Sequence, residues 1–156
     1  MNTDPAFATA GAVIIFALSA AGSALGCGAA AAAAVGAWKK CFAQNKPAPF
    51  TLLTFVGAPL TQTLYGMLLM FIIAGKAGAE LVPGAGVALL VLSVFVGLAI
   101  GLSAWLQGRA AAGAADAQAE TGQGFINYLA AIGIVETIAI FVFVFMIFTV
   151  NNFVQN

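Results

Sequence analysis

The chain has 156 residues, of which 63% are hydrophobic and only 6% are charged, with five basic and five acidic side chains and no histidine. Water-soluble domains carry about 25% charged residues, so this composition excludes an ordinary soluble domain and indicates a protein of the lipid bilayer. Two cysteines in dissimilar surroundings, Cys27 and Cys41, argue against a disulfide framework or a zinc site. The lack of histidine also argues against a histidine-based catalytic triad.

Four apolar segments follow one another along the chain. Each is long enough to cross about 30 Å of hydrocarbon, for which about 20 helical residues suffice. The first is expected to remain in the mature protein, because Asp4 stands where a signal peptide carries basic residues and the apolar run is too long. The sequence therefore predicts an all-α membrane protein with four transmembrane helices. They cover approximately Ala6–Trp38, Phe50–Ala74, Gly86–Ala115 and Phe125–Val150.

The lysines are distributed unevenly between the two ends of these helices. Lys39, Lys40 and Lys46 cluster after the first helix, next to Trp38, which is expected to anchor that end at the membrane interface. On the other side Lys76 is offset by nearby acidic residues. Because cytoplasmic loops carry an excess of lysine and arginine, both hairpin loops are predicted to face the cytoplasm. Both termini then lie outside, in a multi-pass protein of the cell (inner) membrane.

The two halves of the chain resemble each other. The segment "SALGCGAAAAA" from Ser23 aligns with "SAWLQGRAAAG" from Ser103, and "QTLYG" from Gln62 aligns with "ETIAI" from Glu136. This self-similarity predicts two duplicated antiparallel helical hairpins. The first hairpin is assigned to residues 1–78 and the second to residues 79–156.

Hairpin geometry predicts which polar residues share a depth in the membrane. Antiparallel helices rise equally per residue, so residues at equal depth lie symmetrically about the loop midpoint. Gln107 and Glu136 average to position 121.5, within the turn signal "ETGQG". Cys27 and Gln62 average to 44.5, within "AQNKP" of the other loop. We therefore expect Gln107 beside Glu136, with Gln62 at the matching level of the other hairpin.

Glu136 is an acidic residue in the otherwise apolar segment "VETIAIFVFVFMIF". A charge at the centre of a membrane helix costs about 2.5–3.5 kcal/mol on insertion scales, and such acids usually mark ion pathways. A proton needs one acceptor, whereas a hard cation such as sodium prefers several oxygens. Thr61, Gln62 and Gln107 offer such oxygens, and Pro59 perturbs its helix so that a backbone carbonyl is available nearby. The sequence thus predicts a reversible ion site, with sodium favoured over a proton.

These residues lie in motifs that resemble a known family. The segments "APLTQTLYGM", "LSAWLQGRAAAG" and "GIVETIAIF" are similar to the matching segments of the duplicated membrane-rotor proteolipid of V-type and A-type rotary ATPases, called the K subunit in bacteria. The resemblance covers all four predicted spans. It implies sodium ligands at Thr61, Gln62, Gln107, Glu136 and the backbone carbonyl of Ala58, where the family often has leucine, and a hydrogen bond from Tyr65 to the occupied carboxylate.

The resemblance also implies a homo-oligomeric rotor ring, a stator membrane subunit beside it, central-stalk subunits at the cytoplasmic loops and surrounding lipid. Glu136 would take Na⁺, or H⁺, from a half-channel and carry it in neutral form as the ring turns. Glycine pairs at four-residue spacing, Gly22/Gly26 and Gly97/Gly101, suit the first and third helices for a tight inner layer. No nucleotide-binding motif GxxxxGK[ST] occurs, so ATP chemistry is expected in other subunits. No nucleic-acid partner is expected.

Other interpretations of the same residues remain open. The nearest is the same rotor carrying protons, with the glutamines only hydrogen-bonding a protonated Glu136. A protonated Glu136 could also serve merely to join helices, as Thr and Gln often do in membranes. A non-transporting tetraspan organiser would have longer, interaction-rich loops. A self-contained transporter would need a complete alternating-access path, which one ionisable site does not provide.

Overall fold

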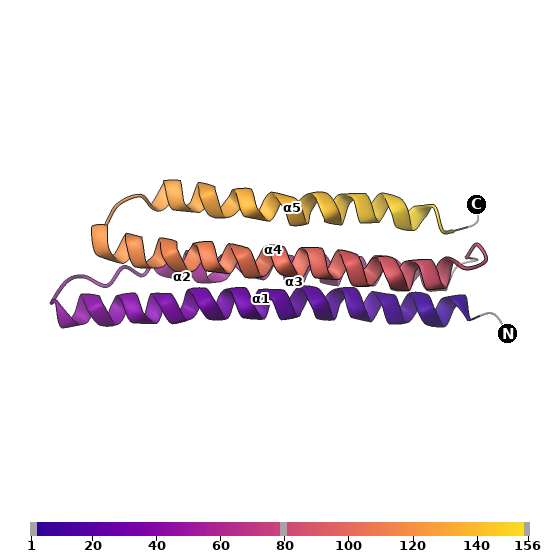
Figure 1. Cartoon of the computed structure of the whole chain (residues 1–156), viewed down its shortest axis with the longest axis horizontal. Coiled ribbons are helices and arrows are strands. Elements are labelled where there is room, and N and C mark those ends of the chain that lie inside the picture. Colours follow the sequence, from indigo (N-terminus) through magenta and orange to yellow (C-terminus); the bar gives the residue numbers. More distant parts are fainter. Residues whose placement is uncertain (1–2, 79–80, 155–156) are drawn as a thin grey trace.

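The computed structural model describes residues 3–78 and 81–154, and most of these residues are helical (Figure 1). When α2 to α3 is taken as one span, four helices are long and apolar enough to cross a membrane, which confirms the predicted all-α membrane fold. The isolated bridge between Leu81 and Val154 is the β pairing found in the described residues. The elements are α1 (Asp4–Ala43), α2 (Leu52–Gly57), the 3₁₀ turn η1 (Ala58–Leu60), α3 (Thr61–Ala77), α4 (Ala85–Thr121) and α5 (Phe125–Asn151).

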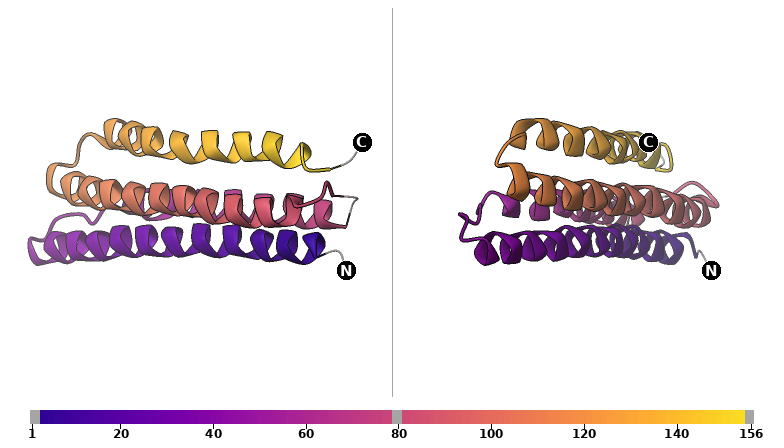
Figure 2. Two further views of the ribbon diagram at one scale, coloured as in Figure 1. Left: turned by 45° about the vertical axis from the view of Figure 1, so that its right-hand side comes forward. Right: turned by 60° about the vertical axis from the view of Figure 1, so that its left-hand side comes forward.

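The helices lie side by side along one long axis (Figures 1 and 2). The α1–α2 and α4–α5 loops lie at one end of the bundle, and α1 begins and α5 ends at the other. α1 packs most extensively against α4, while α3 packs on α1 and α5 packs on α4. Each hairpin is therefore joined to the other mainly through the α1–α4 contact. The predicted boundary between the hairpins, after residue 78, adjoins residues 79–80, which lie outside the described residues and leave that division a prediction.

Glycines bring the backbones of α1 and α4 into direct contact. A Cβ atom at Gly22 would overlap the backbone of Gly101, and one at Gly108 would overlap the backbone of Gly26. These partners are 79 and 82 positions apart, close to the offset of 80 that aligns Ser23 with Ser103. α1 and α4 thus run parallel, with equivalent repeat positions next to each other. Small residues permit this close approach, which is how helices associate where lipid supplies no hydrophobic driving force.

The α4–α5 turn has the geometry that its sequence predicts. Gly122 and Gly124 have φ angles of 70° and 86°, a left-handed conformation that glycine adopts at little cost. The backbone N–H of Gly122 donates to the carbonyl of Gln118 and ends α4. This short, sharp turn keeps the two helices symmetric about it. Gln107 and Glu136 therefore lie at the same depth, as predicted, and their side chains are hydrogen-bonded.

The other hairpin has a different register from the predicted one. A Cβ atom at Gly66 would lie 2.6 Å from the Cβ of Ser19, and one at Gly26 would lie 2.9 Å from the Cβ of Pro59. Between these two contacts, Gln62 faces the level of Ser23, about one helical turn from Cys27. The pairing of Cys27 with Gln62 is therefore wrong. α1 continues to Ala43, the connection up to residue 49 is not helical, and the 3₁₀ turn changes the rise per residue, so the hairpin is not symmetric about position 44.5.

α5 is the most exposed of the four spans, and its outer face is apolar. Phe141, Phe145 and Phe148 are each more than 60% exposed. A contiguous apolar surface of this kind is stable in lipid and would be a liability in water. Phe141 belongs to this exposed face. Phe143, one of the same run, instead packs against Tyr65, with ring centroids 5.4 Å apart.

Candidate functional site

A helix break places Thr61 and Gln62. Pro59 has no backbone N–H and so cannot make a regular helical bond. The chain forms a 3₁₀ turn over Ala58–Leu60 and begins α3 at Thr61. The Thr61 hydroxyl donates to the Ala58 carbonyl at 3.2 Å and also lies 3.1 Å from Gln62 Oε1. The predicted perturbation at Pro59 is therefore present, and it gathers two oxygen atoms, the Ala58 carbonyl oxygen and Gln62 Oε1, around the Thr61 hydroxyl.

Two buried glutamines from different hairpins meet next to this turn. Gln62 on α3 and Gln107 on α4 are both fully buried, and Gln62 Nε2 donates to Gln107 Oε1 at 2.7 Å. A buried amide left without partners would cost about 1–3 kcal/mol by protein mutational data, so the pairing matters for stability. This contact links the two halves of the chain at the depth of the carboxylate.

Glu136 receives two hydrogen bonds from neighbouring helices. Tyr65 donates its hydroxyl to Oε1 at 2.6 Å, and Gln107 Nε2 lies 3.3 Å from Oε2. The same Gln107 nitrogen also donates to the carbonyl of Ile132 at 3.2 Å. Glu136 itself is half-buried, with Tyr65 of α3 on one carboxylate oxygen and Gln107 of α4 on the other. Hydrogen bonds to a carboxylate stabilise its charged form, which is otherwise costly in a membrane.

The predicted site residues form one connected network. It runs from the Ala58 carbonyl and Thr61 through Gln62 and Gln107 to Glu136, and Tyr65 closes it on the other carboxylate oxygen. The predicted set of oxygens is nevertheless only partly turned toward one point. Gln107 presents its amide nitrogen, not its oxygen, to Glu136, and its oxygen is hydrogen-bonded to Gln62. A cation that takes both amide oxygens would require the amide groups to reorient.

Ser103 is a member of this neighbourhood that was not predicted as a site residue. Its hydroxyl donates to the Val135 carbonyl at 3.0 Å, directly before Glu136 on α5. The signal for it is present in the sequence, because Ser103 opens the motif "SAWLQGR" and stands four residues before Gln107 on the same face of α4.

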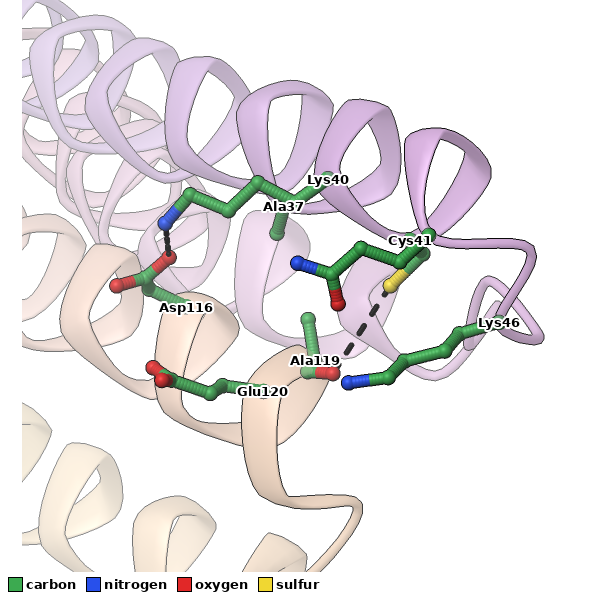
Figure 3. A pocket seen from close by; sticks show the side chains of 8 residues that line it. Ala37, Lys40, Cys41, Lys46, Asp116, Ala119 and Glu120 are labelled. Atoms are coloured by element: carbon green, nitrogen blue, oxygen red, sulfur yellow. Dashed lines mark hydrogen bonds and ion pairs between the residues drawn. The ribbon is translucent and has the colours of Figure 1, made fainter.

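A second polar region lies at the loop end of α1 and α4, shown in Figure 3. It is a pocket of about 320 Å³ in which Lys40 pairs with Asp116 at 2.9 Å and Cys41 donates to the Ala119 carbonyl. Both members of the ion pair are more than half exposed, so their attraction contributes little to stability. Asp116 is nine residues after Gln107, about 14 Å along the helix, so this pocket is separate from the carboxylate network.

In the described ranges 3–78 and 81–154, no three His, Cys, Asp or Glu side chains lie close enough together to hold a metal ion. The side chains hydrogen-bonded to Glu136, those of Tyr65 and Gln107, are neutral, so the site combines one carboxylate with neutral polar groups. Such a donor set suits a hard monovalent ion, whose charge one carboxylate balances, better than a zinc ion, which favours sulfur and nitrogen ligands.

Comparison with known proteins agrees with the architecture of the second hairpin. Residues 84–149 match the family model for the C subunit of ATP synthase. The matched region covers α4 and most of α5, and it includes Gln107, Glu136 and Ser103 but not the α3 residues Thr61 and Gln62. No curated protein sequence matches the chain.

Proposed function

We propose that this chain, whose residues 84–149 match the family model for the C subunit of ATP synthase, is a rotor-ring proteolipid that carries sodium ions at Glu136 in a rotary ATPase of the V type. The observation that supports the proposal most strongly is the network itself. A single membrane-embedded carboxylate is hydrogen-bonded to Gln107 and Tyr65 and joined through Gln62 to the oxygens around Thr61. A site built only for a proton has no need of so many neutral oxygen ligands.

Sodium binding in this proposal replaces hydrogen bonds with cation contacts. The Ala58 carbonyl oxygen and Gln62 Oε1 already lie 3.2 Å and 3.1 Å from the Thr61 hydroxyl oxygen. Oxygens that each lie about 2.3–2.6 Å from one hard cation are separated by about 3.3–3.7 Å in an octahedral arrangement, so only a small expansion is needed. Gln107 then turns its amide oxygen, and Glu136 a carboxylate oxygen, toward the ion, while Tyr65 keeps the other carboxylate oxygen hydrogen-bonded.

Neutralisation is what allows this site to move through lipid. Glu136 is half-buried near the outer surface of α5, and the neighbouring Ile134 and Ile138 are 70% and 58% exposed. A bare carboxylate facing hydrocarbon would cost several kcal/mol, whereas a bound cation makes the pair formally neutral. The exposed position also allows a partner on the outside of the ring to reach the carboxylate. We infer that this partner is a stator membrane subunit whose arginine favours the ion-free carboxylate.

Members of this family assemble into oligomeric rings that face the stator subunit of ATP synthases. The α1–α4 pair, with its glycine contacts, suits the inside of such a ring, and the aromatic face of α5 suits the lipid side. Lys39 and Lys40 at the end of α1 and Lys46 in the loop that follows favour the cytoplasmic side for both hairpin loops, where central-stalk subunits would bind. The family match speaks against a non-transporting tetraspan organiser.

The proton is the second candidate ion, and one observation favours it. Both carboxylate oxygens of Glu136 are engaged by hydrogen bonds from side chains of the protein, and Tyr65 lies 2.6 Å from Oε1, close enough to exchange roles with a protonated carboxyl. In that case Gln62 and Gln107 serve only to complete the hydrogen-bond network.

Carbodiimide labelling of the purified ring distinguishes the two ions, because the reagent attacks the protonated acid and a bound cation excludes it. At a pH where labelling is partial, we expect Glu136 to be the modified residue and sodium chloride to protect it, while the same concentration of choline chloride does not. A Glu136→Gln ring should lose the label, and a Glu120→Gln ring, altered at the exposed loop end, should keep it. Labelling of Glu136 that is indifferent to sodium at every pH would establish the proton interpretation, and labelling of another acid would refute the site.

A further inference from the structure

The hydrogen bond from Ser103 to the Val135 carbonyl joins α4 to α5 and is partly buried. Ser103 is only 4% exposed. In the part of the chain that the structure describes, the side-chain hydrogen bonds between α5 and the other helices all fall within residues 132–136. The buried residues of α5 beyond this turn, Ala139, Met146 and Val150, are apolar. Polar contacts therefore concentrate at the one turn of α5 that carries Glu136.

Two side chains of α4 hold this turn at separate points. Ser103 and Gln107, one helical turn apart on α4, reach the carbonyls of Val135 and Ile132. Apolar helices in lipid slide past one another at little cost, because lipid tails are as apolar as the side chains. A slip of one residue would move Glu136 by about 1.5 Å along the axis, enough to break contacts of hydrogen-bond length. Two anchors fix both the rotation and the axial position of α5.

The duplicated hairpin offers an internal comparison. Ser23 occupies the repeat position equivalent to Ser103 and is also buried, but its hydroxyl has no hydrogen-bond partner among the described residues. Ser93, on α4 itself and fully buried, likewise has none in that part of the chain. Burial of a serine in these helices therefore does not by itself give its hydroxyl a hydrogen-bond partner. The bond occurs at the serine that faces the carboxylate-bearing helix.

We propose that Ser103 is a positioning residue that holds Glu136 in register with Gln107 and Tyr65, and so sets the ion affinity of the site. This proposal rests on the proposed function of Glu136 as an ion site. Ser103 does not contact the carboxylate or the ion. It acts through the Val135 carbonyl, and its loss leaves Gln107 as the only side-chain anchor from α4 on that turn among the described residues.

Three alanine variants of the full-length ring test the proposal, since each removes a single buried hydroxyl oxygen. In Ser103→Ala, the sodium concentration that half-protects Glu136 from carbodiimide should rise about three- to tenfold, the effect of losing one hydrogen bond. In Ser23→Ala and Ser93→Ala it should stay within about twofold of the unaltered ring. Ser103→Thr, which keeps the hydroxyl, should also stay within about twofold. Ring integrity on a native gel and thermal dissociation of the ring are measured for every variant.

The outcomes separate positioning from packing. If Ser103→Ala lowers the dissociation temperature but leaves half-protection unchanged, the serine only packs the helices and the proposal fails. It also fails if all three alanine variants shift half-protection alike, or if Ser103→Thr behaves like Ser103→Ala in an intact ring. If sodium does not protect Glu136 in the unaltered ring, the sodium site itself is refuted, and that result is visible before any serine variant is compared.

Discussion

Replacing Gln107 with leucine tests whether the glutamines are ion ligands or only helix contacts. Gln107 makes three hydrogen bonds, to Gln62, to the Ile132 carbonyl and to Glu136. If Gln107 is a cation ligand, its replacement should lower sodium affinity at least tenfold, equivalent to about 1.4 kcal/mol. The replacement also removes the acceptor of Gln62 Nε2. Because Gln62 is fully buried, a donor left without an acceptor there should destabilise the ring by about 1–3 kcal/mol. The single variant therefore changes both quantities.

The double variant Gln62→Leu/Gln107→Leu separates binding from stability. With both amides removed, no buried nitrogen is left without an acceptor, and the Thr61 hydroxyl still has the Ala58 carbonyl as its partner. Replacing both members of a hydrogen-bonded pair with apolar groups is close to neutral for stability. Ring stability should thus recover most of what the single variant loses. Sodium affinity should fall further, to roughly a hundredth of its original value or less, because two ligands are gone.

The measurement is sodium protection of Glu136 from carbodiimide, beside thermal dissociation of the ring on a native gel. We expect the double-variant ring to stay intact and Glu136 in it to be fully labelled without sodium. Sodium should protect Glu136 in this ring only at very high concentration. Unchanged sodium protection in an intact Gln107→Leu ring would remove Gln107 from the ligand set. Recovery of sodium affinity together with stability in the double variant would show that the amides act only through packing.

Two further changes test single contacts. Tyr65→Phe removes the hydroxyl that donates to Glu136 Oε1, a hydrogen bond to a charged acceptor worth about 1.5–3 kcal/mol, so the sodium concentration that half-protects Glu136 from labelling should rise about tenfold or more, and unchanged half-protection would contradict the contact. Gly22→Ala places a Cβ atom against the Gly101 backbone and should lower the dissociation temperature of the ring clearly, whereas Gly28→Ala, which meets nothing within 4 Å, should not lower it; equal effects would contradict the close α1–α4 approach.

The spans and the Gln107–Glu136 contact could be predicted from the sequence for a simple reason. Hydropathy over about 20 residues is a strong signal, and the turn between α4 and α5 is short and marked by Gly122 and Gly124. Counting outward from a symmetric turn gives the correct register. The same count gave the wrong pairing for Cys27, because the connection before α2 is asymmetric and the turn at Pro59 is 3₁₀.

The arrangement of the site could be predicted only in part. Residue types indicate which side chains offer oxygen, and Tyr65 indeed contacts Glu136. They do not indicate which end of an amide faces a neighbour, since Gln107 can present its oxygen or its nitrogen with almost the same shape. The role of Ser103 was missed because its partner is a backbone carbonyl, a group that every residue carries and that no sequence pattern marks.

The backbone contact between α1 and α4 has a mechanical consequence. α1 has 40 residues and α4 has 37, so they are about 60 and 55 Å long, nearly twice the thickness of the hydrocarbon layer. Two parallel helices that touch along their glycines bend and twist less than one helix alone. The α1–α4 pair is therefore stiffer than a single helix, and we call this pair the shaft of the protein. A torque applied where this shaft emerges from the membrane reaches the level of Glu136 as rotation of the whole unit, with little lost as elastic deformation on the way.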